Sequence, residues 1–289
     1  MAESFAHQFG QIIGEVLENA VKPYLQKFAQ KHGLYLDGKG FRPARSGKKV
    51  TWQDHSGNVH DLDFVLERGG TPEKIGMPVA FIEVACRRYT KHSRNKAQEI
   101  QGAILPLKET YSQVAPVIGV VLAGVFTKGA LDQLRSLGFS VLYFPYESVI
   151  AAFQTVDIEA GFEENTRESE FRKKLSAWKR LSRKKQALVS QTLLNSDPAA
   201  IQKFLDNLEA AVNRRVILIR LLPLHGQAVE FDSLQSALKF IAGYDDQKAQ
   251  TSFVKFEIQV RYSNGDQIQG EFRDKKDARS FLQRLSSGN

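Results

Sequence analysis

Asp61-Leu62-Asp63-Phe64-Val65-Leu66-Glu67 places acidic residues inside an apolar run typical of a β-strand, and Phe81-Ile82-Glu83-Val84-Ala85 does the same further along the chain. An unpaired carboxylate buried in a strand costs much free energy. Two neighbouring strands that each carry one therefore predict that the carboxylates meet at a strand edge and hold a cation. Hard ions such as Mg²⁺ take oxygen ligands, commonly one or two carboxylates together with a substrate phosphate.

Composition sets the broad class of the protein. The 289 residues include 42% hydrophobic and 25% charged residues, which is ordinary for a globular chain and allows more than one domain. No apolar run is long enough to span a bilayer, so we expect no membrane contact. The start, Met1-Ala2-Glu3-Ser4, lacks the pattern of a secretory signal. The single cysteine, Cys86, excludes an internal disulfide, and we expect a cytoplasmic protein.

The charge balance indicates an anionic partner. The formal net charge is +8 and the pI is near 9.4, and a basic balance favours polyanions, of which nucleic acid is the commonest. Many basic proteins bind no polyanion, so the placement of the charge matters more than its sum.

Hydrophobic periodicity predicts an α/β fold, a mixed α+β sheet flanked by helices, for the N-terminal half. Val117-Ile118-Gly119-Val120-Val121-Leu122 has the nearly unbroken apolar run of a strand buried on both faces. The expected elements in chain order are a helix over 3–32, strands over 49–54, 60–67 and 79–85, a helix over 93–111, a strand over 117–122, a helix over 127–137 and a strand over 140–144.

Three domains are expected: a core over 1–160, a basic helical connector over 161–214, and a small domain over 215–289. The last contains an internal repeat. Two hairpins, the second turning at Asn264-Gly265, are each followed by a helix, which predicts a duplicated ββα unit. The matching positions at one constant offset are Phe231, Ala237 and Phe240 in the first copy and Phe272, Ala278 and Phe281 in the second.

The core resembles the PD-(D/E)xK nuclease superfamily over roughly residues 1–150, on the leading helix, Asp63-Phe64, Phe81-Ile82-Glu83-Val84 and the helix and strand that follow. The resemblance implies a restriction-endonuclease-like core in which Asp63 and Glu83 bind Mg²⁺, for which Mn²⁺ can substitute. Asp61 shares a predicted strand face with Asp63 and is a further candidate metal ligand. The family's lysine falls here on Ala85, which is a departure from the pattern.

Three cations are candidates to replace that lysine. Arg87 lies on the same strand face as Glu83, Lys91 follows the strand, and Lys96 stands early on the next helix. We favour Lys96 and keep Arg87 as the alternative catalytic cation. Further candidates for the site are Gln98, Glu99 and Gln101 on that helix and, by resemblance to a helical glutamate of some family members, Glu18 or Glu15.

Each acidic residue also has a plain structural interpretation. Residues 60–64 alternate in polarity, so Asp61 and Asp63 could simply face water from a half-exposed strand. Glu83 is flanked by apolar residues, and a salt bridge to Arg87 or Arg88 would satisfy it without a metal.

Two basic clusters are candidates to contact nucleic acid. Beside the predicted site lie Arg88, Lys91 and Arg94, where several cations at a helix N-terminus oppose the macrodipole and a bound phosphate would offset them. A predicted helix from Arg167 to Lys185 interleaves basic residues with Trp178. The alternative to nucleic-acid binding is an exposed charged helix whose basic residues pair with its own glutamates. The residues chosen on this helix are Lys173, Lys174, Lys179, Arg180, Arg183 and Lys184; the basic loop 39–49 could also touch phosphate.

The sequence therefore leads to two hypotheses. The first is a Mg²⁺-dependent DNA endonuclease, connected with restriction or defence, which by analogy acts as a homodimer. The second is a nuclease-fold protein that binds DNA or RNA without cutting it, for which Ala85 is the best support.

Overall fold

A five-stranded mixed sheet positions the residues of the predicted site. The computed structural model describes residues 4–88, 90–163, 165–223, 227–245 and 254–286, apart from the side chains at 90–93 and 286. Antiparallel pairs join β1 to β4 and β4 to β5, and β5, β6 and β7 are parallel. The strands in spatial order are β1 (Leu34–Gly38), β4 (Phe64–Arg68), β5 (Met77–Arg87), β6 (Val117–Gly124) and β7 (Ser140–Pro145). The predicted mixed α/β architecture is confirmed.

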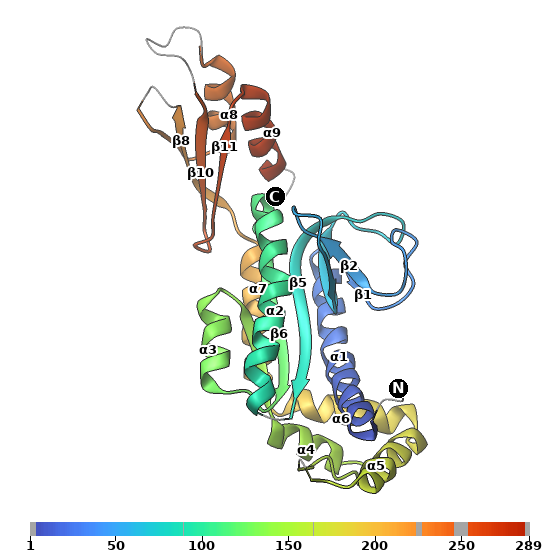
Figure 1. Cartoon of the computed structure of the whole chain (residues 1–289). Coiled ribbons are helices and arrows are strands. Elements are labelled where there is room, and N and C mark those ends of the chain that lie inside the picture. Colours follow the sequence, from blue (N-terminus) through green and yellow to red (C-terminus); the bar gives the residue numbers. More distant parts are fainter. Residues whose placement is uncertain (1–3, 89, 164, 224–226, 246–253, 287–289) are drawn as a thin grey trace.

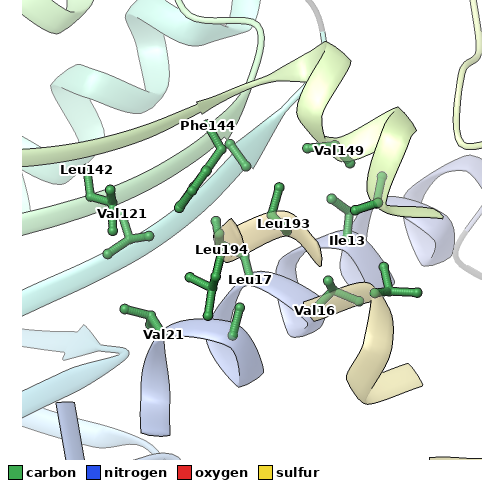
Figure 2. Close-up of a cluster of buried hydrophobic side chains, with 14 of the residues drawn as sticks. Ile13, Val16, Leu17, Val21, Val121, Leu142, Phe144, Val149, Leu193 and Leu194 are labelled. Atoms are coloured by element: carbon green, nitrogen blue, oxygen red, sulfur yellow. The ribbon is translucent and has the colours of Figure 1, made fainter. Parts of the chain in front are cut away.

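One face of this sheet is covered by α1 (Phe5–Lys31) with α4 (Tyr146–Gln154), α6 (Arg183–Asn195) and α7 (Pro198–Val212). The apolar stripe of α1 supplies much of this core. Figure 2 shows the packing: side chains of α1 and α6 lie between the sheet strands and α4. The labelled residues there are Ile13, Val16, Leu17, Val21, Val121, Leu142, Phe144, Val149, Leu193 and Leu194.

The other face is covered by α2 (Thr90–Thr110), α3 (Lys128–Ser136) and a two-stranded sheet of β2 (Val50–Gln53) and β3 (Val59–Leu62). Trp52 of the small sheet packs on Phe81 of β5 with the ring centroids 5.4 Å apart. A short 3-10 turn, η1 (Ser112–Val114), leads from α2 into β6. The sheet is thus buried on both faces, and its functional side chains must lie at strand ends or edges.

The expected single strand over 60–67 is wrong, because the chain bends at Asp63 between β3 and β4. β3 pairs with β2, whereas β4 pairs with β1 and β5. Asp61 and Asp63 therefore do not share a face of one strand. The strand β1, which the sequence did not predict, is the partner that holds β4 in the main sheet.

The predicted helix over 167–185 is also wrong, since it consists of α5 (Glu168–Arg180) and α6. Leu181 is extended, and Ser182 caps α6 by accepting a hydrogen bond from the backbone N–H of Lys185. Trp178 packs on Phe153 of α4 at 5.2 Å between ring centroids, so it faces the core. α5 and α6 thus lie against α1, as Figure 1 shows, and α7 packs on β7 and β5.

The C-terminal segment contains the two predicted ββα units: β8 (Val216–Pro223), β9 (Val229–Phe231) and α8 (Leu234–Gly243), then β10 (Phe256–Tyr262), β11 (Gln267–Phe272) and α9 (Lys275–Ser286). They share one four-stranded antiparallel sheet in which β8 pairs with β10. The repeat is visible in the packing, because Phe231 meets Phe240 at 5.3 Å and Phe272 meets Phe281 at 5.0 Å. In Figure 1 this unit lies beyond one end of α2 and α7.

Within the described ranges, no helix combines the length and the apolar character that crossing a bilayer requires.

Candidate metal centre

Asp63 stands at the bend between β3 and β4, directly beside the middle of β5. Its Oδ2 accepts a hydrogen bond from the backbone N–H of Val84 at 2.6 Å. Burial raises the pKa of the Asp63 carboxyl, while this hydrogen bond and the charge of Lys96 lower it, and the net direction is upward. The Asp63 carboxylate is therefore fixed by a hydrogen bond at a buried position, where its negative charge is unfavourable.

Glu83 lies opposite Asp63 on β5. The register pairs Phe64 with Ile82, and one further step along the antiparallel ladder puts Asp63 beside Glu83. The Glu83 Oε2 atom is buried and has no hydrogen-bond partner. Burial and then the charge of Asp63 raise the pKa of Glu83 to about 8. An unsatisfied buried oxygen beside a second carboxyl is the donor set that a cation would satisfy.

Lys96 of α2 reaches back to the two acids. Its Nζ lies 3.6 Å from Glu83 Oε1 and 2.7 Å from Glu99 Oε1, and its side chain is only 11% exposed. The structure thus places Lys96, one of the three candidate cations, beside Glu83. Ala85, at the family's lysine position, is buried and faces the core on the α2 side of the sheet.

Two further charged residues complete the surroundings of Asp63. Glu18 of α1 has a raised pKa, first because of burial and then because of the charge of Asp63, so the helical glutamate suggested by the resemblance does lie near the acids. Lys39 lowers the pKa of both Asp63 and Glu18. The sequence did not connect Lys39 with this site. No local signal in the sequence reveals it, because the place of Lys39 depends on the pairing of Gly38, which precedes it, with Phe64.

Asp61 is placed elsewhere. It is an exposed residue of β3 whose carboxylate accepts hydrogen bonds from Lys49 Nζ at 2.6 Å and Thr51 Oγ1 at 2.7 Å. These bonds lower the pKa of Asp61, which is the opposite direction from Asp63. The interpretation that Asp61 faces water fits its surroundings.

Arg87 lies near Glu99, and its contacts with described residues do not include Glu83. Its Nη1 donates to the carbonyl of Cys86 at 2.8 Å, and its Nη2 lies 3.8 Å from Glu99 Oε2. No ion pair of Glu83 with Arg87 or Arg88 appears among the described side chains, and the cation beside Glu83 is Lys96. Of the other candidates, Glu15 and Gln98 are exposed, and Gln101 accepts a hydrogen bond from Gln133.

The predicted nucleic-acid contacts divide into engaged and exposed residues. Arg88 donates to the Phe162 carbonyl at 2.7 Å and to Glu163 at 2.9 Å, and its guanidinium lies over the Tyr146 ring. Lys174 donates to the carbonyl of Gly161. The side chain of Lys91 lies outside the described part of the structure. The exposed members are Arg94, Lys173, Lys179, Arg180, Arg183 and Lys184.

The residues fit a magnesium ion with few protein ligands. Among the described residues there is no group of three or more histidine, cysteine, aspartate or glutamate side chains placed to hold a metal. Mg²⁺ does not require one, because it keeps several waters and is bound by one or two carboxylates plus substrate phosphates. Asp63 and Glu83 supply that pair, and the orphaned Glu83 Oε2 is the oxygen the ion would satisfy.

No family model matches the chain, and no curated protein matches it. A solved structure described as "Crystal Structure of Protein of Unknown Function AF1548" is similar at a TM-score of 0.28 and 8% identity, over 67% of this chain and 94% of that chain. A likeness this distant supports no argument about fold or function, so any proposal rests on the geometry of the site.

Proposed function

We propose that the chain is a Mg²⁺-dependent endonuclease that hydrolyses phosphodiester bonds in DNA, built on a restriction-endonuclease-like core. The observation that carries the proposal is the buried, unpartnered Oε2 of Glu83 beside Asp63, with the Lys96 ammonium 3.6 Å from the other Glu83 oxygen. In a purely structural ion pair we would expect both oxygens of the buried carboxylate to have partners.

Each residue has a role in this scheme. Asp63 and Glu83 would hold the ion, which when bound polarises a phosphate and lowers the pKa of water. The Val84 N–H fixes Asp63 in position. Lys96 would place its positive charge against the developing charge on the phosphate, and Glu99, 2.7 Å away, orients the ammonium.

The rest of the molecule supplies the expected surroundings for DNA. Exposed basic residues on α5 and α6, with Arg94 on α2, would contact backbone phosphates without reading sequence. We propose that the protein acts as a homodimer, because a single site in each chain cuts only one strand of a DNA duplex. A restriction or defence role is the biological setting we propose for such an activity.

Cleavage and metal binding test the proposal together. Wild type, Glu83→Gln, Asp63→Asn and Lys96→Met are incubated with plasmid DNA, modified and unmodified, in Mg²⁺ or Mn²⁺. We expect each variant to lose at least about 100-fold in cleavage rate, as for the loss of one electrostatic group at a reacting centre. The matched control is Asp61→Asn, which removes a nearby exposed carboxylate and leaves cleavage unchanged.

Metal binding gives a second measurement that does not depend on finding the right DNA. Added Mn²⁺ should raise the melting temperature of wild type and of Asp61→Asn, because binding to the folded state alone stabilises it. It should not do so in Glu83→Gln. Equal metal stabilisation of wild type and Glu83→Gln would refute the site.

The second candidate is a nuclease-fold protein that binds DNA or RNA without cutting it. The observation in its favour is that Ala85 replaces the family's lysine and that Lys96 is closer to Glu99 than to Glu83. Wild type that binds labelled nucleic acid but cuts none would favour it. Competition between duplex DNA, single-stranded DNA and RNA at one salt concentration would then identify the ligand.

A further inference from the structure

Phe41 is the most exposed large apolar side chain among the described residues, at 82% of its full exposure. A single exposed apolar residue is ordinary on a protein surface. Phe41 differs because both of its neighbours in the chain are held in place: the Gly40 N–H donates to the Lys48 carbonyl, and the Arg42 side chain is buried and hydrogen-bonded.

The residue after Phe41 is the anchor of that structure. The Arg42 side chain is 2% exposed, and it donates to Asp37 at 2.8 Å and to both oxygens of Glu67 at 2.6 and 2.9 Å. It also donates to the carbonyls of Thr71 and Lys74. With Arg42 drawn inward, its neighbour Phe41 points outward.

A second arginine closes the loop 39–49 on itself. Arg45 donates to Asp37 and to the carbonyls of Gly38 and Gly40, each at about 3 Å. The Gly40 N–H donates to the Lys48 carbonyl at 2.8 Å. The basic loop that the sequence suggested for phosphate contact thus uses its arginines internally and leaves Lys48 and Lys49 exposed with Phe41.

The loop 39–49 arises beside the candidate metal centre. It begins after Gly38, which pairs with Phe64, and it ends before Val50, which pairs with Leu62. These two partners flank Asp63 in the chain. Both ends of the loop therefore stand next to Asp63, and Lys39, at its start, lowers the pKa of Asp63.

We propose that Phe41 stacks on an unpaired base, and that the substrate is DNA with an unpaired or easily unstacked nucleotide next to the scissile phosphate. This inference rests on the proposed function and names its substrate class. Aromatic side chains stack on every base, and apolar wedges open base steps in duplexes. Lys39 and Lys48 of the same loop, both exposed, supply charge for the flanking phosphates, whereas Lys49 is held by Asp61.

Binding to matched oligonucleotides tests the inference. The probes are one duplex and the same duplex with a short central gap, each labelled for anisotropy and measured in Ca²⁺ at fixed salt. Wild type should bind the gapped probe about 5- to 150-fold more tightly than the duplex, the range for one stacked base. Phe41→Ala should lose that preference, and Phe41→Trp should keep it.

A base analogue reports stacking directly. With 2-aminopurine in the gap, wild type and Phe41→Trp should quench its fluorescence on binding, and Phe41→Ala should not. The matched control is Val59→Ala, which shortens another exposed apolar residue, 67% exposed, on β3. It should keep both the preference and the quenching. Circular dichroism melts establish that each variant is folded.

The outcomes separate the stacking role from the hydrolase proposal. Phe41→Ala that keeps the gap preference and the quenching would overturn the stacking role, even if wild type cuts DNA at a metal-dependent rate. Wild type that prefers the gap through Phe41 but cuts nothing would refute only the hydrolase. Wild type that binds the intact duplex at least as tightly as the gapped one would overturn the inference.

Discussion

At the residue scale, the informative feature is a side chain that the fold does not satisfy. Glu83 has a buried oxygen without a partner and lies beside a second acid, Asp63. Buried polar groups in native structures are almost always hydrogen-bonded, and the exceptions concentrate at functional sites. Glu83 therefore lowers the stability of the metal-free protein, and a bound cation would restore that stability.

This cost has a definite pH dependence. Below its ordinary pKa of 4.5, Glu83 is protonated in the folded and the unfolded chain, so it contributes no slope. Between 4.5 and about 8 the unfolded chain has lost the proton and the folded chain still holds it, so the free energy of unfolding falls as pH rises. Above about pH 8 both states are ionised, and the loss of unfolding free energy caused by Glu83 is complete.

Glu83→Gln removes that loss because an amide does not ionise. We expect the variant to gain about 1–3 kcal/mol in unfolding free energy over wild type at pH 8, and little at pH 4.5, in EDTA. Urea unfolding at the two pH values measures it, with Asp61→Asn as the control that shows no such gain. A gain of equal size at both pH values would contradict the stated cause.

At the element scale, the bend at Asp63 separates what the sequence predicted from what it did not. The helices and strands from 93 to 144 are confirmed, because each has a clear period or apolar run. His60 to Phe64 alternate like one strand, so local pattern hides the bend. The expected strand is divided into two only because β3 pairs with β2 whereas β4 pairs with β1.

The same reason limits the prediction of the site. The sequence pattern and the resemblance pointed to Asp63, Glu83 and Lys96, and the structure brings these three side chains together, while their roles stay a prediction. Lys39 depends on the unpredicted strand β1 and could not be found locally. Arg42 lies in a basic loop that suggests phosphate contact, and only its pairing with Glu67 shows that it is buried.

Arg42 supports a stability prediction for the loop 39–49. Arg42→Met leaves Asp37 and Glu67 buried with one cation fewer, and breaking a buried pair on one side costs about 3–5 kcal/mol. Adding Glu67→Gln should recover part of that loss, because the stranded charge disappears. Urea unfolding of both variants measures this, with the exposed Lys48→Met as control; a loss under about 1 kcal/mol for Arg42→Met would contradict it.

At the scale of the whole molecule, the basic charge of a segment did not predict whether that segment packs on the core. The basic segment after 161 suggested a connector, yet α5, α6 and α7 contribute Phe171, Leu193 and Phe204 to the same apolar cluster as α1. What lies apart is the ββα pair in Figure 1. A cavity of about 350 Å³, lined by Arg68, Val114 and Leu285 among others, lies where it meets the core.

Arg214 is the side chain that bridges this junction. It donates to Asp266 at 2.7 Å within the ββα pair and to the carbonyls of Val114 and Ala115 in the core, and it lies over the Tyr262 ring at 4.5 Å. Ala115 also packs against the apolar cluster of the ββα pair. We expect the placement of the C-terminal unit to depend strongly on Arg214, because this one guanidinium contacts both parts.

Arg214→Ala should loosen the C-terminal unit without unfolding either part. Hydrogen bonds to charged groups contribute about 1.5–3 kcal/mol each, and here they are all lost together. We expect small-angle scattering to show a larger maximum dimension and amide exchange to quicken around Ala115, while the melting temperature changes little. Arg215→Ala, at the exposed neighbouring position, should leave both measurements as in wild type. Superimposable scattering profiles for wild type and Arg214→Ala would mean that another contact holds the two parts together.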